Sequence, residues 1–177
     1  MASPLSTNGN AWHIVYTKSR REKKLHDECL RIGLLAYLPL IKNISVYRRK
    51  IFESTKPLFP GYVFCCFERA QRKDLYQTGH VAKLISVVDQ EGLMRDLIEI
   101  EKAISIEASL EPYTYLKRGT RARIVDGPFQ GIEGIISHRR GKYRLVMNVN
   151  LIEMAAAIEV NACQIEPLNI RTTPGSG

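Results

Sequence analysis

The sequence lacks any apolar run that approaches the roughly 20 residues needed to cross a bilayer, so no membrane-spanning helix is expected. Residues 1–10 are polar and lack the apolar stretch of a secretory signal. The sequence has only four cysteines, Cys29, Cys65, Cys66 and Cys163, and none has C-x-x-C spacing. This favours small buried side chains in a reducing compartment. We therefore expect a cytoplasmic protein that does not act at a membrane.

The residue patterns of common catalytic and metal sites are also missing. The four histidines are scattered along the chain, and neither a P-loop nor a G-x-S-x-G motif occurs. The adjacent Cys65 and Cys66 lie in an apolar run, where burial raises the pKa of a thiol and weakens it as a nucleophile. We expect a protein that is not an enzyme and that uses neither a cofactor nor a metal ion.

Positive charge is what the sequence has in excess, and it is unevenly placed. The net charge is +8, and residues 18–50 contain ten lysines and arginines against three acidic residues. Residues 51–116 are slightly acidic, and residues 117–177 are again basic. A concentrated basic surface beside an acidic one is typical of a protein that faces a polyanion, although a solvated helix face is the simpler alternative for any one cluster.

The run at residues 57–67 is the most apolar and aromatic part of the chain, and it carries a Pro-Gly turn signal. After the turn, residues 61–67 are uncharged, which predicts a central strand covered on both faces. Alternation predicts another strand at residues 11–17. Residues 35–41 predict a third strand, with Pro39 at an edge or a bulge, and residues 81–88 a fourth.

Helical spacing predicts an amphipathic helix after Ser19, with Ser19 and Glu22 forming a capping box and Gly33 ending the helix. Further helices are predicted at residues 70–80 and 92–106. Two apolar patches flank a basic tip in residues 43–56, which predicts a projecting hairpin. The predicted fold of residues 11–106 is therefore α+β, an antiparallel sheet packed with helices.

The second half of the chain has a different pattern. Residues 107–117 lose the helical spacing and predict a linker, and residues 118–168 contain five short strand signals that predict a small SH3-like β-barrel. Residues 1–10 predict a disordered lead-in, and residues 169–177 a flexible tail. Residues 151–159 are rich in helix formers, which conflicts with the strand expected there.

Three motifs together resemble the NusG family of transcription factors. They are Trp-His-Ile-Val-Tyr at residues 12–16, Pro-Leu-Phe-Pro-Gly-Tyr-Val-Phe at residues 57–64, and the glycine-rich turn at residues 125–134. The order is similar to an NGN domain followed by a KOW domain. The segments 18–24, 37–40 and 141–146 are more similar to RfaH and to the antiterminators of polysaccharide operons than to housekeeping NusG.

The resemblance implies a monomeric factor that binds the clamp region of RNA polymerase and suppresses pausing, and so promotes elongation and antitermination. It implies a polymerase pocket at Tyr16, Phe59, Pro60 and Phe64. Aromatic side chains suit such an interface because they give large contact area at low entropic cost. Phe59 is expected to be partly exposed, whereas Phe64 is as well explained as a core residue. The helix formers at residues 151–159 raise a further hypothesis, that the second domain switches between a helical hairpin and a barrel, as in RfaH.

The basic residues then have non-template or upstream DNA as a candidate partner, and the acidic polymerase surface as another. These residues are Lys18, Arg20, Arg21, Lys24, Arg48, Arg49 and Lys50. In the second domain the resemblance implies a KOW loop formed by Asp126, Gly127, Pro128, Phe129 and Gly131, and recruitment of Rho or of a small-subunit ribosomal protein. The alternative function is an RNA- or ribosome-binding KOW protein that acts in translation or ribosome assembly.

Overall fold

The computed structural model of the chain describes residues 10–106, 110–113, 115–116 and 119–168. The predicted tail and nearly all of the predicted lead-in lie outside these residues, as does part of the predicted linker. None of the helices in the described ranges is both long and apolar enough to span a membrane.

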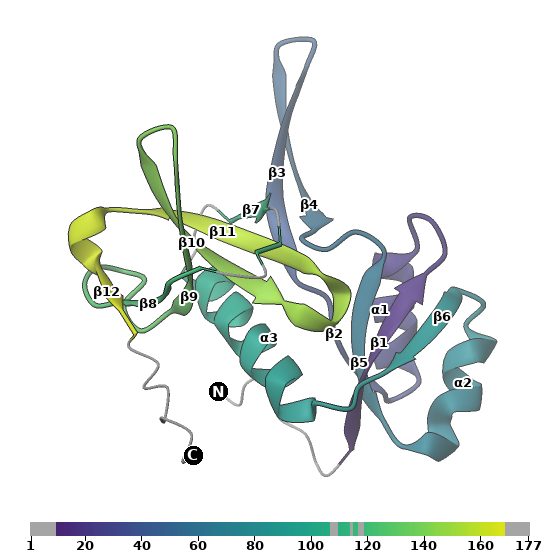
Figure 1. Cartoon of the computed structure of the whole chain (residues 1–177). Helices are drawn as coiled ribbons and strands as arrows, with labels where there is room; N and C mark the ends of the chain where they lie inside the picture. Colours follow the sequence, from purple (N-terminus) through teal and green to yellow (C-terminus); the bar gives the residue numbers. More distant parts are fainter. Residues whose placement is uncertain (1–9, 107–109, 114, 117–118, 169–177) are drawn as a thin grey trace, which may run out of the picture.

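A four-stranded antiparallel sheet organises the first half of the chain (Figure 1). Its strands are β1 (Ala11–Thr17), β2 (Leu35–Tyr37), β5 (Tyr62–Phe67) and β6 (Val81–Ser86), in the order β2-β5-β1-β6. The strand predicted at residues 61–67 is confirmed as a central one, because β5 pairs with β1 on one side and with β2 on the other.

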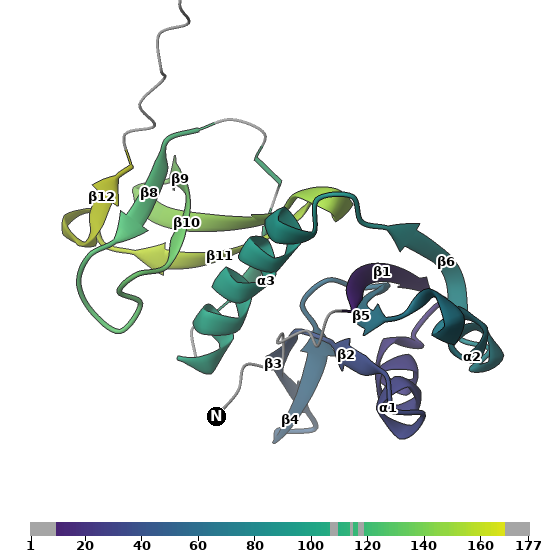
Figure 2. The same ribbon diagram turned by 90° about the horizontal axis from the view of Figure 1, so that it is seen from below.

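Helices cover both faces of this sheet, as the uncharged sequence of β5 predicts. The helices α1 (Glu22–Arg31) and α2 (Arg72–Gln77), the latter preceded by the 3-10 turn η1 (Arg69–Gln71), lie on one face. The longer α3 (Gln90–Ser105) lies on the other face (Figure 2). Cys65 packs with α1, and Cys66 packs in the cluster that contains α3, so adjacent residues of β5 serve opposite cores.

The start of α1 differs from the prediction. The helix begins at Glu22, its N-cap is Arg21, and no side chain caps it, so the capping box expected for Ser19 and Glu22 does not form. Glu22 Oε1 instead accepts a hydrogen bond from the backbone N–H of Gly61, at 2.8 Å. Its carboxylate is thus engaged by the turn before β5. Gly33 ends the helix as predicted, with φ +79°.

The strand expected at residues 35–41 is interrupted at Pro39, and the chain beyond it enters a separate hairpin of β3 (Leu40–Tyr47) and β4 (Lys50–Pro57). This hairpin forms its own two-stranded ladder and projects from the body of the protein (Figure 1). Its tip residues Arg48 and Arg49 both have positive φ, at 47° and 63°. The predicted projecting hairpin with a basic tip is confirmed.

The second half forms a six-stranded antiparallel sheet, in the order β12-β8-β9-β10-β11-β7. The strands are β7 (Glu111–Tyr113), β8 (Arg121–Ile124), β9 (Glu133–Arg139), β10 (Lys142–Val149), β11 (Met154–Val160) and β12 (Ile165–Pro167), with 3-10 turns η2 (Asn150–Ile152) and η3 (Ala162–Gln164). In the described ranges no ladder joins β7 to β12, so the closed barrel is not seen. β7 lies within the predicted linker and pairs with β11.

Most of the segment rich in helix formers, residues 151–159, is a strand: residues 154–159 lie in β11, and residues 151–152 end the 3-10 turn η2. Ala155, Ala156 and Ala157 are all buried in β11, where small side chains fit between packed layers. Local propensity is overridden at this point by tertiary packing.

One apolar cluster runs through both halves. It contains Trp12, Ile14 and Phe64 of the first sheet with the buried residues of α3, and it continues into Leu145 and Ile158 of the second sheet. Figure 2 shows α3 between the two sheets. The helix therefore belongs to both cores.

Candidate functional site: an aromatic patch and basic hairpins

An aromatic patch lies where the α3-covered face of the first sheet becomes exposed. Trp12, Ile14 and Tyr16 lie on this face of β1; the first two are buried, but 44% of Tyr16 is exposed. Tyr62 is the cross-strand partner of Tyr16, and their ring centroids are 5.2 Å apart. Pro60, next to this pair in the chain, is also exposed. The patch of Tyr16, Pro60 and Tyr62 extends an apolar core to the surface.

Gly61 fixes the position of Tyr16. Its φ is +88°, and a Cβ on this residue would lie 2.8 Å from Cε2 of Tyr16. The Gly61 carbonyl accepts a hydrogen bond from the N–H of Thr17, and its own N–H is bound by Glu22. A glycine is required here both for the turn and for the close approach of the tyrosine ring.

Two of the four predicted pocket residues are buried. Phe59 is 1% exposed and Phe64 is 0% exposed, and their rings pack edge to face at 6.5 Å in the core that includes α3. The expectation that Phe59 is partly exposed is therefore wrong: the turn at Pro60 directs it inward. Phe64 is a core residue. Both support the patch from beneath.

The seven predicted nucleic-acid-binding residues are all exposed, but they divide into two groups. Lys18, Arg20, Arg21 and Lys24 belong to the turn before α1 and to its first turn; Arg48, Arg49 and Lys50 form the hairpin tip. Lys18 is tied down, because its Nζ donates to the carbonyl of Gly79 at 2.7 Å. Lys23, which the prediction omitted, donates to the Thr55 carbonyl at 2.5 Å and joins α1 to the hairpin base.

The β3–β4 hairpin also exposes apolar side chains. Ile44 and Ile51 are 66% and 70% exposed, and Phe52 is about half exposed. Ile44 and Ile51 lie on one face of the ladder, and Phe52 lies on the other. The hairpin therefore combines a cationic tip with apolar flanks, a composition suited to contact with a large partner.

The predicted KOW loop follows β8, and its residues are exposed except for Phe129. Phe129 is half-buried and packs against the apolar cluster that both halves share. The N–H of Gly131 donates to the carbonyl of Ile124 at 2.8 Å, and Gln164 Nε2 donates to the Asp126 carbonyl. The loop is thus closed by backbone and side-chain hydrogen bonds.

A cavity of about 560 Å³ separates part of α3 from the second sheet. Asp96 Oδ2 accepts hydrogen bonds from the backbone N and from Nδ2 of Asn150, at 3.0 and 2.9 Å. Glu99 Oε2 accepts one from the N–H of Glu133, at 2.9 Å. Burial raises the pKa of Asp96, and the Asn150 hydrogen bonds partly oppose this rise. Polar contacts thus join α3 to the second sheet.

The buried cysteines have the environment expected of structural residues. The Sγ atoms of Cys29 and Cys65 are 3.8 Å apart. The contact with Cys29, together with burial, raises the pKa of Cys65, and burial alone raises the pKa of Cys66. Among the described residues, no three His, Cys, Asp or Glu side chains are grouped to hold a metal ion.

Tyr62 and Glu22, like Lys23, are residues of this region that the sequence prediction missed. Tyr62 follows the Pro-Gly turn, but its pairing with Tyr16 depends on the register of β1 against β5. Glu22 fits a local capping pattern, and that pattern gives no indication of its hydrogen bond to the distant Gly61. The alternation of Tyr62 with Phe64 was the available signal, since both lie on one face of β5.

Comparison with known proteins identifies the family. A family model described as transcription termination factor nusG matches residues 10–108, more than half of the chain. The chain belongs to the NusG family. The matched segment contains the first sheet, α1, α2, α3 and the β3–β4 hairpin.

A crystal structure of the MjSpt4:Spt5 complex, conformation B, aligns with 89% of this chain and 97% of that chain, at 13% identity and a TM-score of 0.27. A TM-score of this size gives no information about the fold or function of this chain. Family membership itself supports a general role as a transcription elongation factor.

Proposed function

We propose that this protein is a non-enzymatic elongation factor of the RfaH-like kind, which binds RNA polymerase and promotes antitermination by suppressing pausing. The observation that carries the proposal is the NusG-family match over residues 10–108, with the aromatic patch inside the matched segment. The second half of the chain acts as a KOW domain and recruits a further partner, such as Rho or a small-subunit ribosomal protein.

The polymerase contact is made by the aromatic patch. Tyr16 and Pro60 are exposed and Tyr62 is half-buried, so the patch is a surface continuous with the core, and little conformational entropy is lost when a partner covers it. Phe59 and Phe64 have an indirect role, since they are buried and hold the strands in place. The partner surface is an apolar pocket on the clamp of the polymerase.

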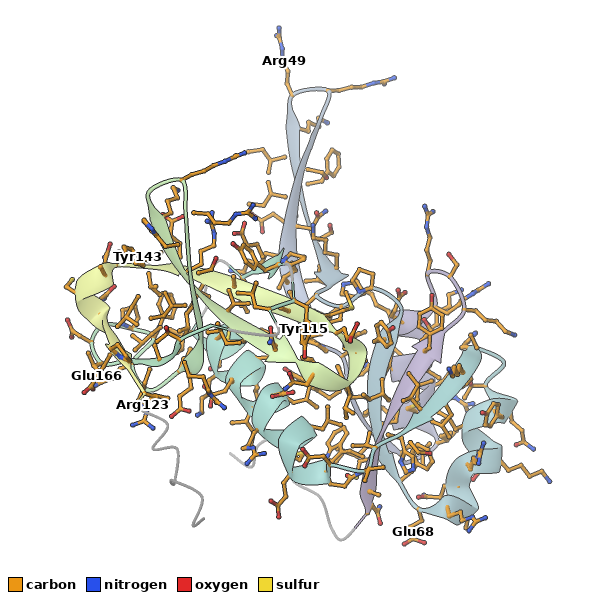
Figure 3. The ribbon with its side chains drawn as sticks, viewed as in Figure 1. Arg49, Glu68, Tyr115, Arg123, Tyr143 and Glu166 are labelled. Carbon is orange, nitrogen blue, oxygen red and sulfur yellow. The ribbon has the colours of Figure 1, made fainter. Side chains whose placement is uncertain are left out.

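The basic residues contact the phosphate backbone of non-template or upstream DNA. Arg48, Arg49 and Lys50 are exposed at the tip of a projecting hairpin (Figure 3, where Arg49 is labelled). Such contacts give affinity that decreases with salt and carry little sequence information. Lys18 contributes less than its exposure suggests, because its ammonium group is already bound to Gly79.

Binding of purified core RNA polymerase to the immobilised chain tests the patch. Tyr16→Ala removes a central aromatic side chain, and we expect roughly 30-fold weaker binding, the effect of losing an interface hot spot of about 2 kcal/mol. The matched control is Tyr76→Ala on α2, because Tyr76 is 43% exposed and Tyr16 is 44% exposed. Tyr76 lies outside the patch, so its variant should bind as the wild type does.

Two outcomes count against this account in different ways. If the wild-type chain does not bind core polymerase, the proposed function is wrong. If the wild type binds and both tyrosine variants bind equally well, only the assignment of the patch is wrong. Circular dichroism of each variant, compared with the wild type, verifies that the first sheet is intact.

A further inference from the structure

A second basic hairpin is formed by β9 and β10, and the proposed function does not use it. Residues 138–144 read His-Arg-Arg-Gly-Lys-Tyr-Arg, with four basic residues and no acidic residue. His138, Arg139, Arg140 and Lys142 are exposed. In Figure 1 this hairpin projects toward the same side of the molecule as the β3–β4 hairpin.

The two hairpins share an unusual tip. Arg140 has φ +53° and is followed by Gly141 at +73°, just as Arg48 and Arg49 have positive φ at the other tip. Two-residue turns of this kind favour Asn-Gly, because a residue with a large side chain is strained in the left-handed region. Both turns therefore carry arginine at a strained position of the tip.

The charges of the second hairpin are not equivalent. Lys142 pairs with Glu159 at 2.9 Å, and Arg144 pairs with Glu111 at 2.9 Å while its guanidinium lies over the ring of Tyr113. The sheet thus supplies each of these two residues with an acidic partner. In the described part of the chain the side chains of Arg139 and Arg140 form neither an ion pair nor a hydrogen bond, so their positive charge is available to a partner.

An aromatic pair lies on the opposite face of this ladder from Arg139, one residue away in the chain. His138 and Tyr143 are cross-strand partners, and their rings stack at a centroid distance of 4.2 Å with an interplanar angle of 23°. Tyr143, labelled in Figure 3, is half-buried and packs against the shared core. The exposed His138 ring is therefore supported from behind by an anchored tyrosine.

We propose that the tip of the β9–β10 hairpin binds single-stranded nucleic acid, with Arg139 and Arg140 on phosphates and the His138–Tyr143 stack against a base. Adjacent guanidinium groups and a supported ring are the elements that single-strand binding sites combine. An unpaired base can reach such a ring, whereas the bases of a duplex are stacked on one another and cannot. The site is independent of polymerase binding.

The test is fluorescence anisotropy of the full chain with labelled oligonucleotides of about 15 nucleotides, at about 50 to 200 mM salt. Arg139→Ala/Arg140→Ala should weaken binding at low salt at least tenfold. It should also reduce the slope of log affinity against log salt by about 1.4, because two phosphate contacts are lost. Oligouridine and oligodeoxythymidine form separate arms, which tell whether RNA or DNA is preferred.

The ring is tested separately. His138→Ala should weaken binding about fivefold or more, as expected for loss of stacking on one base, while the salt slope keeps its wild-type value. His138→Phe retains a ring and should restore most of the affinity. This pair of results distinguishes stacking from a general effect of charge.

The charge-matched control is Arg69→Ala/Lys73→Ala, which removes two exposed positive charges from η1 and α2. It should bind as the wild type does. The proposal is overturned if this control weakens binding as much as the Arg139→Ala/Arg140→Ala variant, or if the latter binds normally. It is also overturned if labelled polyglutamate binds as tightly as the oligonucleotides and His138→Ala has no effect, because the partner is then an acidic protein.

Discussion

The two sheets hold α3 in different ways. Toward the first sheet the contact is mainly apolar, with Trp12, Ile14 and Phe64 in one cluster with the buried residues of α3. At the start of α3, the Gln90 side chain also exchanges two hydrogen bonds with the backbone of Trp12. Toward the second sheet, apolar packing is supplemented by direct hydrogen bonds to Asp96 and Glu99, which line a cavity there. α3 therefore belongs to both cores, and its contact with the second sheet includes Asp96, a half-buried carboxylate whose pKa is raised by burial.

The largest expected effect on stability is at the apolar contact between the first sheet and α3. Phe64→Ala removes a fully buried ring from the centre of the first sheet, and we expect the free energy of unfolding to fall by about 3 to 5 kcal/mol. Urea unfolding followed by circular dichroism measures the change. A loss below about 1 kcal/mol would mean that the apolar contact between the first sheet and α3 contributes little to stability.

A smaller effect is expected at the turn that positions the patch. Gly61→Ala and Gly33→Ala both place alanine in a left-handed conformation, at φ +88° and +79°, which costs about 1 to 2 kcal/mol. Only at Gly61 does the new Cβ meet the Tyr16 ring; at Gly33 nothing lies within 4 Å. We expect Gly61→Ala to cost about 1 kcal/mol more in urea unfolding and to weaken polymerase binding. If Gly61→Ala and Gly33→Ala had equal effects on unfolding and on polymerase binding, Gly61 would not be the residue that positions Tyr16.

The contact between α3 and the second sheet should make the free energy of unfolding depend on pH. The pKa of Asp96 is raised above its ordinary value of 3.8, so the folded state binds this proton more tightly than the unfolded state. The contribution of Asp96 to stability is therefore greatest at acidic pH and decreases as pH rises from 3.8 through the raised pKa. Subtracting the urea-unfolding profile of Asp96→Asn from that of the wild type should isolate this decrease.

Asn150→Ala provides the companion measurement. It removes the hydrogen bond from Nδ2, which lowers the pKa of Asp96, and keeps the one from the backbone N–H, so the decrease should extend to higher pH than in the wild type. If the difference in unfolding free energy between the wild type and Asp96→Asn did not change with pH, this would contradict the burial of the Asp96 carboxyl between α3 and the second sheet.

The smallest expected effect on stability is at the β3–β4 tip, which lies outside both cores. Arg48→Asn/Arg49→Gly introduces the preferred residues of a tight hairpin turn, and we expect about 0.5 to 1 kcal/mol of added stability. The same variant should bind DNA more weakly, since it loses two positive charges. Reduced stability in urea unfolding would show that the arginines serve the fold.

Most of the first half could be predicted from the sequence. The central strand at residues 61–67 and the projecting hairpin follow from local patterns, namely an uncharged run and a basic tip between apolar patches. The NusG family membership, which the three motifs indicated, is confirmed by the match over residues 10–108. The RfaH-like specialisation, the KOW domain and the division into domains remain predictions.

What the sequence could not reveal depends on contacts between distant segments. Glu22 satisfied a local capping pattern, yet it binds Gly61, and β7 pairs with β11 although its residues resemble a linker. Phe59 was expected to be partly exposed, but the chain direction at Pro60 places it in the core. Register and the path of a turn determine these positions, and neither is encoded in a short window of sequence.

The most direct test of the account is the lifetime of a defined pause during transcription by purified RNA polymerase. Addition of the wild-type protein should shorten the pause; Tyr76→Ala should act as the wild type does, and Tyr16→Ala should have little effect at the same concentration. Pauses that are unchanged or lengthened by the wild-type protein would contradict the proposed role in antitermination.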